Sequence, residues 1–123
     1  MLTDQDLLIG TYRAFNASDI DTVLDVIHPD VIWQNGCEGG MLHGKLELRD
    51  YWTRHWNAVD PFVEQIGFTV QADGRMLVTT HQVVRDLEGN VIDDRIVEHL
   101  ILIENGLIRG IEIRRVEVQS GGT

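Results

Sequence analysis

Four polar residues lie in or at the end of segments whose other residues are typical of buried β-strands. They are Asn35, Gln82, Arg95 and His99. Burying a polar group costs free energy unless it is hydrogen-bonded, so polar residues on the inner face of a sheet usually line a ligand cavity. Imidazole titrates near neutrality and can act as a general acid or base, whereas amide and guanidinium groups orient a substrate through hydrogen bonds. The pattern predicts a small-molecule pocket with His99 as its titratable centre.

Length and charge restrict the number of domains and the kind of ligand. The chain has 123 residues, of which 43% are hydrophobic, which suffices for one core and leaves no room for a second. The formal net charge of -10 argues against nucleic acid or an anionic membrane as a partner, because phosphate binding needs a basic surface. We therefore expect an apolar, neutral or cationic ligand. We assign residues 1–119 to a single domain and residues 120–123 to a disordered tail.

Cysteine and histidine usage gives no sign of a bound metal. Cys37 is the only cysteine, so neither an intramolecular disulfide nor a multi-cysteine metal site can form. No two histidines stand four residues apart on one predicted helix, and we expect neither a metal nor a cofactor. The first residues do not resemble a secretion signal, and no apolar run approaches the roughly 20 residues that span a bilayer. We expect a cytoplasmic protein.

Helical periodicity characterises the first half of the chain. Capping-box-like residues precede two amphipathic helices, expected near residues 3–15 and 20–27, and Pro29 is expected to end the second. The segment DVIWQN predicts a short strand, followed by the glycine-rich loop GCEGGMLHG. A third helix is expected to begin near Lys45 and to end at Pro61.

From Phe62 onward the chain is rich in β-forming residues. Runs at 63–72, 76–86, 91–104 and 107–118 are separated by the turn signals ADG, LEGN and ENG, which predicts an antiparallel meander. The fold class is therefore α+β, with three helices packed on one face of a curved antiparallel β-sheet. Both faces of the 91–104 run are largely apolar, so we expect a second copy or another partner to cover the back of the sheet.

Three segments of the sequence together are similar to a known superfamily. The run YRAFNASDIDTVLDVIHPDVIW, the segment HGKLELRDYW and the closing IENGLIRGIEI resemble the NTF2-like superfamily, in particular its SnoaL-like and ketosteroid-isomerase-like branch. The resemblance covers nearly the whole chain and implies a cone-shaped fold and a homodimer formed through the sheet face. It does not define the activity, because the superfamily includes isomerases, cyclases, dehydratases, epoxide hydrolases and non-catalytic binding domains.

The resemblance also assigns positions. The general-base aspartate of ketosteroid isomerases corresponds to Asn35, the acid that donates to the enolate corresponds to His99, and the tyrosine of the first helix corresponds to Thr11. An amide cannot accept a substrate proton, which argues against steroid isomerisation. A branch similar to epoxide hydrolases uses an Asp-Arg-Asp set, for which Arg95 could pair with Asp50 or Glu112.

Strand alternation then selects the candidate site. Trp33 and Asn35 share one face of their strand while Gln34 faces the other way, and His81 is expected to point away from the pocket. The pair Asp93 and Asp94 is interpreted as solvated and close to a turn. We assign His99 and Asn35 as candidate catalytic residues, and assign substrate binding to Trp33, Tyr51, Trp52, Thr80, Gln82, Arg95 and Tyr12.

Two functions remain open from the sequence. The first is cofactor-independent acid-base catalysis on an apolar carbonyl compound, of the isomerase, cyclase or dehydratase type. The alternative is a non-catalytic ligand-binding or dimerisation module, in which His99 is a structural histidine and Trp52 and Trp56 fill the core. Asn35 favours the alternative. The buried polar residues favour the first, because a purely structural core would contain Leu or Val in their place.

Overall fold

The computed structural model describes residues 3–34 and 40–115. Asn35, Cys37 and the expected tail at 120–123 lie outside these residues. The elements in chain order are α1 (Asp4–Asn16), α2 (Ile20–Asp25), β1 (Ile27–Gln34), β2 (Met41–His43), α3 (Gly44–Ala58), β3 (Val59–Val70), β4 (Met76–Asp86), β5 (Val91–Glu104) and β6 (Leu107–Arg115). Within the described residues the strands form one sheet in the order β2-β1-β6-β5-β4-β3.

Local sequence signals explain several of these boundaries. Thr3 caps α1 in a capping box, because its hydroxyl accepts from the backbone N–H of Asp6 and the Asp6 carboxylate accepts from the N–H of Thr3. The ENG signal is confirmed as the β5–β6 turn, where Asn105 and Gly106 have φ values of 53° and 77°. Positive φ at both central residues is the requirement of the tightest hairpin turns, which Asn-Gly meets at little cost.

The two prolines do not end helices, contrary to the sequence prediction. α2 already ends at Asp25 and α3 at Ala58, while Pro29 lies within β1 and Pro61 within β3. A strand tolerates proline where no ladder hydrogen bond is needed from its nitrogen. Pro29 lies where the register of β1 against β6 shifts, and Pro61 belongs to β3, an edge strand of the sheet.

The sheet is mixed, which corrects the prediction of an antiparallel sheet. β3 through β6 form the expected antiparallel meander. β1, however, runs parallel to β6, with Ile32 opposite Gly110 and Trp33 opposite Ile111. Parallel neighbours need a long connection, and here the whole chain from β2 to β5 provides it.

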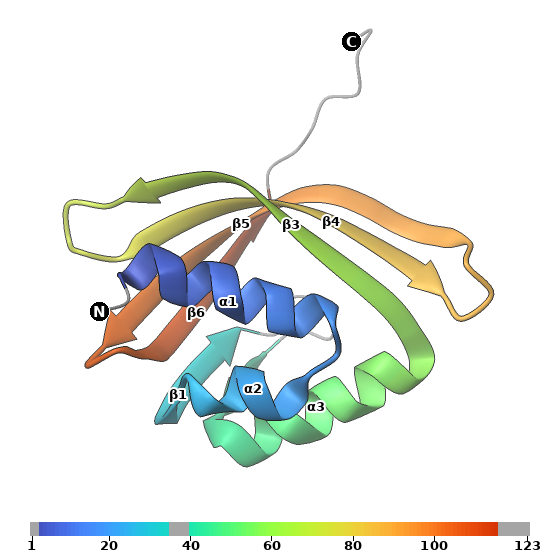
Figure 1. Cartoon of the computed structure of the whole chain (residues 1–123), viewed down its shortest axis with the longest axis horizontal. Coiled ribbons are helices and arrows are strands. Elements are labelled where there is room, and N and C mark those ends of the chain that lie inside the picture. Colours follow the sequence, from blue (N-terminus) through green and yellow to red (C-terminus); the bar gives the residue numbers. More distant parts are fainter. Residues whose placement is uncertain (1–2, 35–39, 116–123) are drawn as a thin grey trace, which may run out of the picture.

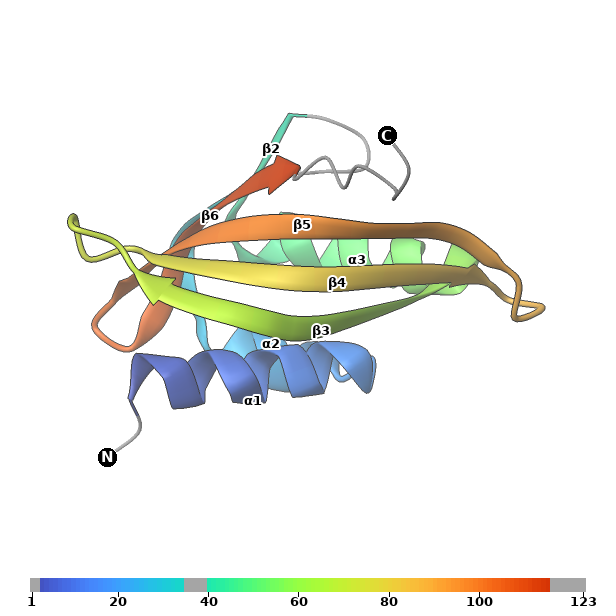
Figure 2. The same cartoon turned by 90° about the horizontal axis from the view of Figure 1, so that it is seen from above.

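The helices lie on one side of the curved sheet. Strands β3 to β6 arch over α1, and α2 and α3 lie on the same side (Figure 1). Seen from above, β3, β4 and β5 run next to one another for most of their length, roughly along the direction of α1 (Figure 2). The core between the two layers contains fully buried apolar side chains from both, including Leu8, Val23, Ile27, Leu48, Trp52, Val78 and Ile101. Each contributes about 2 kcal/mol through its buried area. None of the described helices is long and apolar enough to span a membrane.

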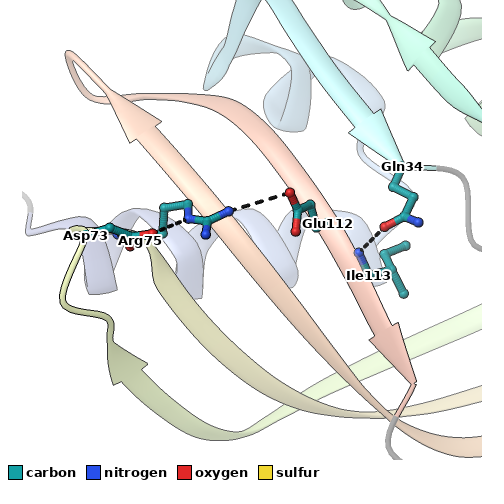
Figure 3. A network of polar contacts seen from close by, with 5 residues as sticks. All are labelled: Gln34, Asp73, Arg75, Glu112 and Ile113. Atoms are coloured by element: carbon teal, nitrogen blue, oxygen red, sulfur yellow. Dashed lines mark hydrogen bonds and ion pairs between the residues drawn. The ribbon is translucent and has the colours of Figure 1, made fainter.

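Polar contacts extend across the sheet at its ends. The Gln34 side chain, at the end of β1, accepts a hydrogen bond through Oε1 from the Ile113 backbone N–H at 2.6 Å (Figure 3). This contact continues the β1–β6 pairing beyond the last backbone pair. Arg75 lies between Asp73, at 2.8 Å, and Glu112, at 3.5 Å (Figure 3). Because these three groups are partly exposed, we expect their ion pairs to contribute little to stability.

Candidate functional site

A cavity of about 360 Å³ lies between the helices and the sheet face that they cover. Its walls are mostly apolar and come from α1, α3 and five strands, including Leu8, Phe15, Trp33, Trp52, Val97 and Ile101. A volume of a few hundred cubic ångströms is typical of pockets for small organic molecules. The polar side chains that reach this cavity therefore determine what it can bind.

The register of β4 and β5 brings polar residues onto the cavity wall. Gln82 lies opposite Arg95, and Val84 lies opposite Asp93. Because side chains alternate along a strand, Asp93, Arg95, Val97 and His99 all face the cavity. Arg95, Gln82 and His99 are thus brought together on the predicted face.

Tyr12 and His99 form the central polar pair of the cavity. The Tyr12 Oη lies 2.5 Å from His99 Nδ1, and the two rings are nearly parallel, at 9°, with centroids 5.8 Å apart. On its other side, His99 Nε2 lies 3.1 Å from Gln82 Nε2. Both imidazole nitrogens therefore have a protein partner, and His99 is only 6% exposed.

Burial keeps this pair uncharged. It lowers the pKa of His99 to about 4, because a buried imidazolium loses its hydration. Burial also raises the pKa of Tyr12 well above its ordinary value. At neutral pH the site therefore contains a neutral imidazole and a neutral phenol.

The Gln82 amide determines the tautomer of this neutral imidazole. With the Gln82 amide oriented so that its nitrogen faces His99, that nitrogen donates to Nε2 and the ring proton is on Nδ1. The Nδ1–H then donates to the Tyr12 oxygen. Within the described part of the chain, no second partner is placed for the Tyr12 hydroxyl, whose own proton is available to a molecule in the cavity. The arrangement offers one hydrogen-bond donor in an apolar space.

The tyrosine of the first helix is not at the position that the resemblance implied. Thr11 lines the cavity, but its hydroxyl donates to the Leu7 carbonyl at 2.7 Å. The phenol comes from the next residue, Tyr12. The sequence placed Tyr12 in the site without identifying it as the partner of His99. The helical spacing of Leu8, Tyr12 and Phe15, which all line the cavity, is the signal that favours it.

Thr80 has a structural role and does not line the cavity. It is fully buried, and its hydroxyl donates to the Val97 carbonyl on the neighbouring strand at 2.8 Å. The assignment of Thr80 to substrate binding is therefore not supported by its position. Gln34, in contrast, lines the cavity although the sequence predicted that it faces away from Trp33. It lies at the end of its strand, and its side chain turns towards the backbone of Ile113.

Arg95 pairs with Asp93, and not with the carboxylates considered from the sequence. Its Nε and Nη2 atoms lie 2.9 and 2.8 Å from the same oxygen, Asp93 Oδ1. Asp50 binds Arg54, and Glu112 binds Arg75. Asp93 lies within β5 and lines the cavity with its side chain 36% exposed, which corrects its interpretation as a turn-proximal residue while leaving it partly solvated.

The neighbouring residue Asp94 points to the other face of the sheet. There its carboxylate lies 2.5 Å from His81 Nε2. His81 therefore points away from the cavity, as predicted.

Aromatic side chains form much of the apolar wall. Trp33 and Trp52 meet edge to face at 5.2 Å, and both line the cavity. Trp52 is also buried in the core, so it fills both of the roles that the sequence left open. Tyr51 stacks on His55 with centroids 5.5 Å apart, and both reach the cavity, although His55 was not among the assigned residues.

Among the described residues, no group of three or more potential metal ligands is close enough together to hold a metal ion. Asn35, one of the two candidate catalytic residues, lies outside the described residues, so its role stays a prediction from the sequence.

Solved structures share this fold over most of their length. An NTF2-like protein of unknown function from Burkholderia pseudomallei is 21% identical, with a TM-score of 0.80, over 94% of this chain and 92% of that one. A candidate polyketide cyclase from Pseudomonas putida is 20% identical, with a TM-score of 0.76, over 95% and 94%. TerC, co-crystallised with polyporic acid, is 20% identical, with a TM-score of 0.78, over 90% and 89%. Identities this low establish the fold alone.

The fold is thus of the NTF2-like class, an α+β architecture. The sequence pattern of the SnoaL-like domain matches residues 9–111, and the chain belongs to that family. No curated protein sequence matches the chain. The resemblance to the NTF2-like superfamily and its SnoaL-like branch, stated from the sequence, is confirmed.

Proposed function

We propose that this SnoaL-like protein binds a small, largely apolar carbonyl compound and catalyses cofactor-independent proton transfer on it. The reaction would be an isomerisation, a cyclisation or a dehydration. The observation that carries the proposal is the Tyr12–His99–Gln82 chain of hydrogen bonds in an otherwise mostly apolar cavity. The hydrogen bonds within this chain offset the cost of burying its polar groups, and the Tyr12 hydroxyl is left to donate into the cavity.

In this proposal the substrate carbonyl accepts a hydrogen bond from the Tyr12 hydroxyl. A water molecule that enters the cavity with the substrate takes the α-proton and later returns it to the product. As the carbonyl changes to an enolate, negative charge grows on its oxygen, and the Tyr12 proton moves closer to it. The His99 Nδ1–H then stabilises the charge that develops on Tyr12. His99 acts as a neutral donor, since its pKa of about 4 leaves little imidazolium at neutral pH. Gln82 keeps the ring in the tautomer that can donate.

The cavity wall supports an aromatic or polycyclic substrate. The edge-to-face pair of Trp33 and Trp52 and the ring of Tyr51 offer flat apolar surface. The structural neighbour TerC was co-crystallised with polyporic acid, which supports a small organic molecule as the occupant.

Binding without catalysis is the second candidate. It is favoured by the neutrality of the Tyr12–His99 pair, because in the described part of the chain neither residue is hydrogen-bonded to a carboxylate that could remove a substrate proton. The two candidates differ in one measurable property, namely whether a bound ketone exchanges its α-protons.

Deuterium exchange tests this difference. para-Acetylbiphenyl in D₂O is followed by proton NMR with wild-type protein and with His99→Ala, while its affinity is measured by calorimetry. Faster loss of the methyl signal with wild type than with His99→Ala supports catalysis. Binding that depends on His99 without any exchange supports the binding module, and no binding of this or other apolar ketones contradicts both.

We also propose a homodimer formed through the sheet face that the helices leave open. Ile32, Gly110 and Leu102 lie side by side on three neighbouring strands, on the face opposite the cavity. Ile32 is 41% and Leu102 40% exposed, and glycine between them makes this strip flat. An exposed apolar strip on a sheet is typical of a protein interface.

A further inference from the structure

Arg95 and Asp93 form a second polar group on the wall of the same cavity. Both Arg95 donors in the pair bind one carboxylate oxygen, Asp93 Oδ1. In the described part of the chain, no partner is placed for Asp93 Oδ2 or for Arg95 Nη1. The pair therefore presents an acceptor and donors next to each other, on a surface that a ligand can reach.

This pair lies away from the Tyr12–His99 pair along β5. Arg95 is four residues before His99 on the same strand face, and a strand rises about 3.3 Å per residue, so their Cα atoms are roughly 13 Å apart. Gln82 lies opposite Arg95 and extends towards His99, so it covers the wall between the two polar groups. A ligand that contacts both groups must be elongated, with oxygen atoms at opposite ends.

The chemistry of the pair selects the kind of oxygen that it can bind. An anionic group would be repelled by the Asp93 carboxylate, and a cationic group by the Arg95 guanidinium. A hydroxyl suits the pair, because the same atom donates to Asp93 Oδ2 and accepts from Arg95 Nη1. The acidic surface of the protein, with a net charge of -10, further disfavours an anion.

We propose that Arg95 and Asp93 form a subsite for a hydroxyl group at the far end of an elongated ketone whose carbonyl lies at Tyr12. This inference rests on the proposed function, since it places the carbonyl at the Tyr12–His99 pair. It identifies the ligand class more narrowly, as a hydroxylated aryl or ring ketone, and gives Arg95 and Asp93 the role of specificity residues.

Three probes of matched shape separate the two ends of the site. They are para-acetyl-para′-hydroxybiphenyl, para-acetylbiphenyl, which lacks the hydroxyl, and para-phenylphenol, which lacks the carbonyl. Dissociation constants are measured by calorimetry. We expect the hydroxy-ketone to bind wild type about tenfold more tightly than the ketone, the usual effect of hydrogen bonds to charged groups.

Variants then locate the effect. In the double variant Asp93→Asn/Arg95→Met, the two ketones should bind equally, and Asp93→Asn alone should reduce the tenfold ratio in the same direction. Tyr12→Phe should weaken both ketones and leave their ratio unchanged. The matched control is Asp73→Asn/Arg75→Met, a pair with the same spacing in the chain whose residues do not line the cavity. It should preserve the tenfold ratio.

The possible failures are distinct. Equal binding of the two ketones to wild type overturns the inference, and if Tyr12→Phe still weakens both, the proposed function stands. A tenfold ratio that persists in the Asp93→Asn/Arg95→Met variant also overturns it, because the hydroxyl would then bind elsewhere. If neither ketone binds, the inference falls together with the placement of the carbonyl at Tyr12.

Discussion

The hydroxyl of Tyr12 lies 2.5 Å from Nδ1 of His99, although the two residues are 87 positions apart in the sequence. One comes from the helix that begins the fold and the other from the middle of β5. Their contact joins the helical layer to the sheet through a polar bond inside a mostly apolar space. This hydrogen bond offsets the cost of burying the two polar groups, and the proposed chemistry follows from it.

Replacing Tyr12 by Phe should weaken ketone binding about tenfold, because it removes the donor that faces the cavity while keeping the ring. Calorimetric titration with para-acetylbiphenyl measures this change. The neighbouring change Thr11→Val is the control, since the Thr11 hydroxyl is used by the Leu7 carbonyl. If Thr11→Val weakens binding as much as Tyr12→Phe, the donor has been assigned to the wrong residue.

His99 should make the fold less stable in acid. Its pKa is about 4 in the folded protein and close to 6.5 when unfolded, so the unfolded chain binds more protons between these values. The full contribution of neutral His99 to the free energy of unfolding is present above pH 6.5 and is lost progressively as the pH falls towards 4. The loss is on the order of 3 kcal/mol.

Urea unfolding at a series of pH values measures this loss. Wild type should lose more free energy of unfolding between pH 7 and pH 4.5 than the variant His99→Gln, which cannot take up the proton. The comparison removes the contribution of the other ionisable groups, which both proteins share. If the free energy of unfolding changes with pH identically in the two proteins, the imidazole of His99 is not buried in its neutral form.

Gln82→Glu should change the tautomer of His99. A carboxylate accepts where the amide donates, so the ring proton should move to Nε2 and the pKa of His99 should rise from about 4. The Tyr12 hydroxyl would then donate to Nδ1 and be lost to the ligand. Nitrogen-15 NMR of the imidazole distinguishes the two tautomers directly.

Ketone binding should weaken in the same Gln82→Glu variant. Gln82→Met is the control for side-chain volume: it removes the hydrogen bond to Nε2 without imposing the other tautomer. A wild-type spectrum that already shows the Nε2–H tautomer would contradict the role given to Gln82.

Leu102→Asp should dissociate the proposed homodimer. A carboxylate in the strip formed by Ile32, Gly110 and Leu102 would have to be buried without a partner at the interface. Analytical ultracentrifugation gives the mass of the particle. Leu87→Asp, at a more exposed leucine in the β4–β5 turn, is the control and should leave the mass unchanged. A wild-type monomer would refute the dimer.

Much of the fold could be predicted because its signals are local. The capping box at Thr3, the helical periodicity of α1 and α3 and the Asn105-Gly106 turn each depend on residues within a few positions of one another. The errors came from signals whose meaning depends on distant partners. Pro29 and Pro61 are helix breakers in isolation, but the sheet accepts them at a register shift and on an edge strand.

The same distinction between local signals and distant partners applies to the candidate site. The period of two along β5 placed Arg95 and His99 on the cavity face, which is a property of any strand. The partners of these residues did not follow from that period. Arg95 pairs with Asp93 two positions away, whereas the resemblance to epoxide hydrolases offered Asp50 or Glu112 as partners, and Thr80 uses its hydroxyl within the sheet.

The sequence by itself determined the family, the α+β class, the helices and the meander, and the face on which the polar residues lie. These depend on periodicity and on turn chemistry, which act over short distances along the chain. Only the tertiary structure decided that β1 runs parallel to β6, that Tyr12 meets His99 Nδ1 and that Gln82 meets His99 Nε2. Those relationships arise where α1 packs against the sheet and the strands pair, because hydrogen bonds of about 3 Å depend on positions that only the folded chain fixes.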